Sequence, residues 1–122
     1  MQALDWIVRI VAAGVLLQTL YFKFTGAPES VYIFTSLGVE PWGRIGSGIA
    51  ELVASVLLLW SGTAGYGGAL AAAIMVGAIG SHLTLLGIEV QGDRGLLFAL
   101  ACIVLICSLT TLVIHRSQLR LA

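Results

Sequence analysis

Charged side chains are scarce in this chain of 122 residues. Lysine and arginine total 6, aspartate and glutamate total 6, and charged residues make up 10% of the sequence against 59% hydrophobic ones. Soluble domains of ordinary composition carry about 25% charged residues. Because the net charge is zero, the sequence offers no basic surface for nucleic acid or for anionic lipid head groups. These shortages argue against a water-soluble domain and against a nucleic-acid-binding protein.

Motifs for cofactors and metals are also missing. The two cysteines, Cys102 and Cys107, stand five residues apart and do not form a C-x-x-C pair. The sequence has no glycine-rich nucleotide loop, no histidine pair with haem-like placement and no cluster of metal ligands. We therefore expect no intrinsic cofactor and no metal site. In a redox reaction, a bound quinone or a partner protein would have to carry the electrons.

Long apolar runs dominate what is present. A helix needs about 20 apolar residues to cross a hydrocarbon core of about 30 Å. Four runs approach this length, at residues 4–24, 43–60, 65–86 and 95–114. The alternating segments of about ten residues that build a β-barrel are absent. The sequence predicts one all-α domain over residues 1–122, an integral membrane four-helix bundle embedded in a lipid bilayer.

The connection between the first and second spans is the longest and has internal structure. Pro28 suits the first position of a helix, and Gly38 suits the position after its end. Val31, Phe34 and Leu37 follow at helical spacing between them. We expect a short interfacial helix across the outer mouth of the bundle. The alternative is an irregular loop.

Small residues recur every four positions in two of the spans. Such rows let helix backbones approach closely in lipid. They predict that the second and third spans pack on each other. The rows are Ala69, Ala73, Gly77 and Ser81 in the third span, and Gly46, Ala50 and Ala54 in the second.

An even number of spans places both termini on one side of the membrane. Basic residues are almost evenly divided between the two sides, with Arg116 and Arg120 near the C-terminus. If Lys23 and Arg44 lie in the bundle interior, they do not count towards the orientation. The other basic residues then favour cytoplasmic termini, because cytoplasmic segments are richer in lysine and arginine.

Polar residues form a stripe on the second span. Arg44, Ser47, Glu51 and Ser55 share one helical face because they are spaced by three or four residues. A charge at bilayer depth costs roughly 2.5–3.5 kcal/mol on insertion scales, so such residues normally face a bundle interior. We therefore expect this stripe to point inward.

Helix counts at 1.5 Å per residue bring polar residues of three spans to one depth. Gln18, Lys23, Glu51 and His82 fall in one layer of the outer half, with Asp93 and Arg94 at its rim. A carboxylate and an imidazole in such a layer can exchange a proton near neutrality. We predict that Glu51 and His82 are the catalytic pair, and that Gln18, Lys23, Arg44, Ser47 and Ser55 bind the ligand.

Simpler interpretations of these residues stay open. The layer can be a structural interhelical hydrogen bond that only holds the bundle together. Lys23 can extend to the interface, as lysines near helix ends do. Arg9, four residues after Asp5, is expected to form an interfacial ion pair with it. His115 and Arg116 are expected to anchor the chain at the interface, and Glu40 is expected to be a solvated loop charge.

In order and spacing, these residues resemble the DoxX family of small bacterial membrane proteins with four spans. The resemblance covers nearly the whole chain: Gly14 and Lys23 in the first span, Gly48-Ile49-Ala50-Glu51 followed by Val56-Leu57-Leu58-Leu59 and Gly62, and Ala71-Ala72-Ala73 leading to His82. Ser55 stands where the family pattern has a glycine.

The resemblance implies a four-span fold in the inner membrane of a bacterial cell, next to a redox partner protein. The family takes its name from a subunit similar to one linked to thiosulfate:quinone oxidoreductase, and other members are associated with oxidative-stress complexes. A distant animal relative acts as a receptor-assembly chaperone. Thiosulfate oxidation itself does not transfer, because this chain has no thiol pair.

Two function hypotheses follow. The first is a homo-oligomeric membrane subunit that binds a quinone or another lipophilic ligand and supports a redox partner. The second is a non-enzymatic assembly or scaffold subunit whose polar residues bind other helices. A proton-coupled transporter is a third hypothesis, for which the inverted halves of known transporters are not visible.

Overall fold

The computed structural model describes residues 2–40, 42–87 and 95–119, and all of its regular structure there is helical. The elements are α1 (Gln2–Thr25), α2 (Pro28–Ser36), α3 (Trp42–Leu59), α4 (Ala64–Ser81) and α5 (Leu96–Ile114). Short 3-10 turns at Ser61–Thr63 and Arg116–Leu119 follow α3 and α5, and a π-helical turn at His82–Leu86 extends α4. The all-α prediction is confirmed.

Four of these helices are long and apolar enough to cross a membrane. They cover Ala3–Thr25, Trp42–Leu59, Ser61–Thr84 and Leu96–Ile114, within a few residues of the spans predicted from the sequence. The chain is thus a multi-pass membrane bundle, with large apolar side chains exposed on its outer faces.

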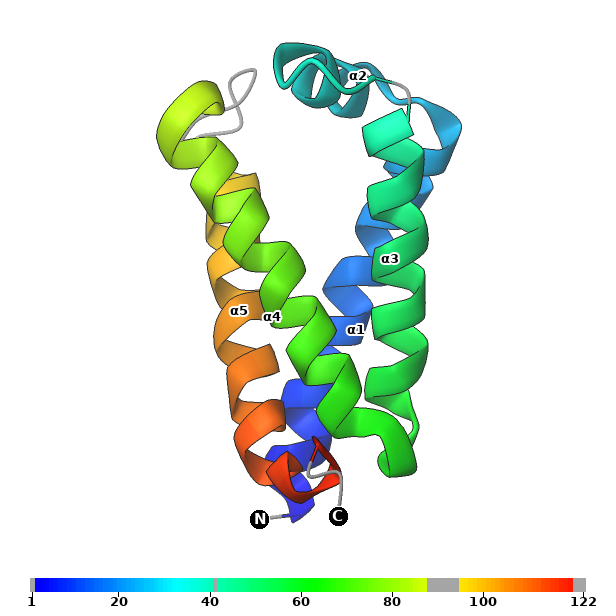
Figure 1. Cartoon of the computed structure of the whole chain (residues 1–122), viewed down its shortest axis with the longest axis vertical. Helices are drawn as coiled ribbons and strands as arrows, with labels where there is room; N and C mark the ends of the chain where they lie inside the picture. The colour runs from blue at the N-terminus through cyan, green and yellow to red at the C-terminus, as the bar shows by residue number, and fades with distance from the viewer. Residues whose placement is uncertain (1, 41, 88–94, 120–122) are drawn as a thin grey trace.

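The four long helices form a ring in which each one packs against two neighbours. α1 lies against α3 and α5, and α4 lies against the same two helices. The first turn of α1 and the end of α5 lie at the same end of the bundle, as Figure 1 shows. Asp5 Oδ1 and His115 Nε2, 2.9 Å apart, connect them there. The termini are therefore on one side, as four spans require.

The bundle is closed at this end and open at the other. In Figure 1 the α1–α3 pair and the α4–α5 pair meet near the termini and separate towards the opposite end. The buried core occupies the middle and the closed half, with Leu16, Leu58, Ala71 and Val104 among its members. Helix α2 lies across the open end.

Helix α2 confirms the short helix predicted between the first two spans. Pro28 occupies its first turn, where a fixed φ suits helix initiation. Gly38 follows its end with φ +77°, a conformation that glycine adopts without steric cost, and its N–H donates to Thr35 O. α2 therefore starts at Pro28 and ends at Ser36, two residues before the glycine that the sequence indicated as its stop signal.

The prediction that the second and third spans pack on each other is confirmed, but only some of the predicted small residues lie in buried positions. α3 does pack on α4, but Ala73, Gly77 and Gly46 are exposed, and a Cβ built on either glycine meets nothing within 4 Å. The close approaches come at Gly67, where a Cβ would lie 2.6 Å from Leu58 N, and at Gly68. The rows therefore indicated the right pair of helices, but Gly46 and Gly77 have no neighbour close enough to make the contact.

Arg9 stabilises the closed end from inside. Its side chain is 0% exposed, and its Nε donates to Leu58 O at 2.6 Å. Nη1 reaches Asp5 Oδ2 at 3.3 Å and Ser61 Oγ at 3.4 Å, and the guanidinium lies 3.9 Å from the centre of the Trp6 ring. The predicted Arg9–Asp5 pair is confirmed, but Arg9 is buried against α3 and does not lie at the interface.

We predict that Gly68→Ala lowers the free energy of unfolding by about 1–3 kcal/mol, since a Cβ there would lie 2.8 Å from Ser108 O and 2.9 Å from Leu112 N. The matched control is Gly80→Ala on the same helix. No atom lies within 4 Å of its Cβ, so it should gain about 0.5–1 kcal/mol from helix propensity. Equilibrium unfolding in mixed SDS micelles measures both. Equal effects of the two variants would contradict the close α4–α5 contact.

Candidate functional site

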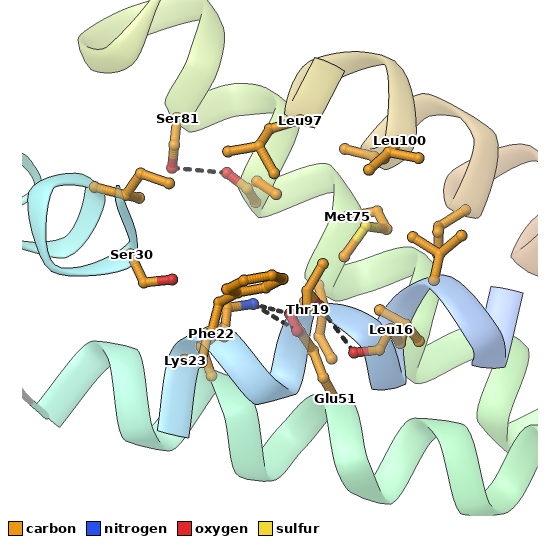
Figure 2. A pocket seen from close by; sticks show the side chains of 18 of the residues that line it. Leu16, Thr19, Phe22, Lys23, Ser30, Glu51, Met75, Ser81, Leu97 and Leu100 are labelled. Atoms are coloured by element: carbon orange, nitrogen blue, oxygen red, sulfur yellow. Dashed lines mark hydrogen bonds and ion pairs between the residues drawn. The ribbon is translucent and has the colours of Figure 1, made fainter. Parts of the chain in front are cut away.

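A cavity of about 550 Å³ lies under α2, in the half of the bundle where the helix pairs separate. All five helices contribute to its wall. Figure 2 shows α1 and α3 on one side, α4 and α5 on the other, and Ser30 of α2 at one end. Most of the wall is apolar and comes from Val15, Leu16, Phe22, Ile33, Phe34, Leu37, Ile74, Met75, Gly77, Ala78, Leu96, Leu97, Leu100, Ala101 and Val104. The composition is that of a site for a largely apolar ligand.

Eight polar side chains complete the wall. They come from four of the five helices and from the π-helical turn: Gln18, Thr19 and Lys23, then Ser30, then Ser47 and Glu51, then Ser81 and His82. Thr19 and Ser81 donate to carbonyl oxygens of their own helices, at 2.8 Å to Leu16 O and 2.9 Å to Gly77 O. The polar groups that remain for a ligand are those of Gln18, Lys23, Ser30, Ser47, Glu51 and His82.

An ion pair between Lys23 and Glu51 connects α1 to α3 at the cavity wall. Lys23 Nζ donates to both carboxylate oxygens of Glu51, at 2.5 Å to Oε2 (Figure 2). The Glu51 side chain is 2% exposed and that of Lys23 is 16% exposed. Nζ also lies 6.0 Å from the centre of the Phe34 ring on α2. Lys23 therefore turns into the bundle and does not extend to the interface.

His82 has other partners than Glu51. Its Nδ1 lies 2.9 Å from Gly87 O, and its ring meets that of Phe98 edge-on at 5.6 Å. Because a carbonyl can only accept, Nδ1 carries the hydrogen. No hydrogen bond joins Glu51 to His82, the predicted catalytic pair, among the described residues, and the carboxylate pairs with Lys23 instead. The two side chains line the same cavity from opposite helix pairs.

The polar stripe of α3 is divided between several environments. Ser47 and Glu51 line the cavity, whereas Arg44 and Ser55 do not. Ser55 is buried and donates to Glu51 O at 2.8 Å, one helical turn back. The sequence placed all four residues correctly on one face, but the cavity covers only part of that face. Ligand contact by Ser55 and Arg44 is therefore not supported.

Arg44 acts outside the cavity, at the end of α1. Its Nε lies 2.9 Å from Glu40 Oε1, and its Nη1 donates to Lys23 O. Glu40 is thus paired and is not a solvated loop charge. Gly26, with φ +69°, passes beside this guanidinium, and a Cβ there would lie 3.7 Å from Nη1. Arg44 holds the segment that carries Lys23.

The sequence did not identify the contributions of α2 and Thr19. Ser30 is nearly buried and lines the cavity together with Phe34, one helical turn later. The spacing of four between them was visible in the sequence, but a loop helix can present either face. Asp93 and Arg94, expected at the rim, lie outside the described residues. No group of three or more His, Cys, Asp or Glu side chains is placed to hold a metal within the described ranges.

Comparison with models of known protein families, with curated proteins and with solved structures gave no match. The evidence on function is therefore the site itself. It offers a buried carboxylate, a lysine ammonium, a neutral amide, an imidazole and hydroxyl groups at the wall of an apolar chamber. These groups can orient a polar head group and hold protons, and their catalytic and binding roles stay predictions.

We predict that Lys23→Met alone lowers the free energy of unfolding by about 3–5 kcal/mol, because it leaves the Glu51 carboxylate buried without its partner. The double variant Lys23→Met, Glu51→Met should be markedly more stable than this single variant, since no charge remains to be compensated. Equilibrium unfolding in mixed SDS micelles measures the free energy of unfolding of the unaltered protein, the single variant and the double variant. A double variant less stable than the single one would show that the pair does not hold α1 to α3.

Proposed function

We propose that the protein is a membrane subunit that binds a quinone or a similar lipophilic molecule in this cavity and supports a redox partner. The observation that carries the proposal is an apolar chamber of about 550 Å³ with an ion pair in its wall. Sites for small apolar ligands typically measure about 300–1,000 Å³ and contain a few placed polar groups. The cavity has both properties.

The polar groups suit a head group with oxygen atoms. An ammonium has three hydrogens, and Lys23 uses two of them on Glu51, so the third is available for a carbonyl oxygen. With its Nδ1 hydrogen on Gly87 O, the neutral His82 ring presents Nε2 as an acceptor, for which no partner is found among the described residues. A quinone takes up two electrons and two protons to become a quinol. In this proposal the partner protein supplies the electrons, while Glu51 and His82 hold and pass protons.

The cellular setting is part of the same proposal. We propose a DoxX-like protein of the bacterial inner membrane, a homo-oligomer with both termini in the cytoplasm. The support is the order of Lys23, Glu51 and His82 along four spans, and the shared position of the two chain ends. Lys23 and Arg44 are bonded within the protein, so we do not count them among the basic residues that set the orientation. The remaining basic residues lie mostly near the termini, which supports cytoplasmic termini under the positive-inside rule.

The test starts from protein purified in mild detergent. We expect mass spectrometry of the extracted lipids to find a quinone or a related lipophile in stoichiometric amount. In a titration with decylubiquinone, Glu51→Gln should raise the dissociation constant about tenfold, which corresponds to about 1.4 kcal/mol. Ser47→Ala, which removes a cavity hydroxyl without touching the ion pair, should raise it a few-fold.

The matched control is Asp5→Asn, which neutralises a carboxylate paired at the closed end of the bundle, away from the cavity, and should bind decylubiquinone as the unaltered protein does. If no lipophile is retained, and Glu51→Gln and Ser47→Ala titrate like the control, the binding proposal is wrong. Loss of a co-purifying protein in Glu51→Gln would then favour the scaffold hypothesis.

A further inference from the structure

We infer that the cavity opens sideways into the hydrocarbon layer between α1 and α5, and that its ligand enters there and leaves its tail in the opening. This inference rests on the proposed function, and it names the ligand class. The ligand is an amphiphile with one apolar chain and a head that carries carbonyl or hydroxyl oxygens.

On α1, the cavity lining continues onto the outer surface of the bundle. Gln18 and Phe22 both line the cavity, yet Gln18 is exposed and Phe22 is 45% exposed. Gln18 shares its helical face with Val11, seven residues earlier, and with Tyr21, three residues later, which are exposed large side chains on the outer surface. A wall that includes this face reaches the lipid.

On α5, the lining reaches the surface in the same way. Leu96 lines the cavity and is 57% exposed, and it shares its face with the exposed Ile103, seven residues later. Because α1 and α5 are neighbours in the ring, these two exposed margins border one opening. Gln18 and Phe22 form its α1 side, and Leu96 and Leu100 form its α5 side.

The depth of the opening points to entry from lipid. Gln18 lies seven residues before the end of α1, about 10 Å along the helix, and is therefore inside the span. Below the cavity, the buried side chains of Leu16, Met75 and Val104 close the bundle towards the termini. Helix α2 covers the other end through Ser30 and Phe34.

The side-chain amide of Gln18 favours a ligand with a polar head group. The amide makes no hydrogen bond to any of the described residues, although it stands within a membrane span. A polar group without a partner in hydrocarbon is unfavourable. A carbonyl or hydroxyl that passes the rim can pair with this amide, which both donates and accepts, before it reaches Lys23 and Glu51. The apolar rim around Gln18 suits the tail that remains.

The test uses decylubiquinone with a photoreactive diazirine at the end of its tail. The full chain is reconstituted in vesicles of phosphatidylcholine and phosphatidylglycerol, illuminated, digested and mapped by mass spectrometry. Excess unlabelled decylubiquinone identifies the specific adducts, because labelling from bulk lipid does not compete. We expect competed adducts on residues 15–22 of α1 and 96–103 of α5. Competed adducts confined to α2, or to α4 around Gly77, would overturn the inference.

A variant pair tests the rim separately. Gln18→Leu keeps the approximate size of an exposed side chain and removes its amide, so the chain should fold normally, and the competed labelling should fall several-fold. The control is Thr110→Val, which removes a hydroxyl from a half-buried residue of α5 that donates to Ile106 O and does not line the cavity, and it should leave labelling unchanged. Equal labelling in the two variants would contradict the role of Gln18.

The two proposals fail differently. If the protein binds decylubiquinone in a manner that depends on Ser47, but adducts appear away from α1 and α5, the sideways opening is wrong and the binding function stands. If neither saturable binding nor competed adducts are found, both are wrong.

Discussion

The ion pair between Lys23 and Glu51 is the interaction on which the open half of the bundle depends. Glu51 is almost fully buried, and a carboxylate there without a counter-charge would cost several kcal/mol. Its partner comes from α1, so the pair keeps α1 beside α3 at the level where α4 and α5 have moved away. Arg44 adds to this by donating to Lys23 O while it binds Glu40. The cavity therefore has one wall, made by α1 and α3, that is held together by an ion pair.

The positions of glycines and charged residues explain why one end of the bundle is closed and the other is open. In lipid, helices associate through close packing and polar contacts, since no hydrophobic force draws them together. Gly67 and Gly68 permit such packing of α4 against α3 and α5, and Arg9 adds a buried polar contact to α3 near the same end. Gly77, three turns further along α4, meets no neighbour. The separation of the helices there leaves the space that the cavity occupies.

The fold could be predicted from the sequence, but the partners within the site could not. Apolar runs gave the four spans, and Pro28 and Gly38 bracketed α2, because both signals are local. A rise of 1.5 Å per residue predicted that Gln18, Lys23, Glu51 and His82 lie at one depth, and all four line the same cavity. Counting does not give the rotation of a helix or the rotamer of a long side chain. For that reason the sequence paired Glu51 with His82 and did not show that Lys23 is its partner in an ion pair, and Arg9 was not expected inside the bundle.

The chemistry of the site follows from the fixed tautomer of His82. The π-helical turn brings Gly87 O to Nδ1, which must then keep its hydrogen. A second proton can bind only at Nε2, and binding it makes the ring a cation. On the other wall, Glu51 already shares its charge with Lys23, so a proton on its carboxylate would weaken the ion pair. Proton uptake by His82 adds a charge, whereas proton uptake by Glu51 leaves the lysine charge without its partner. Both changes raise the net charge around the cavity by one, and this change would stabilise the proposed quinone head group as it accepts electrons.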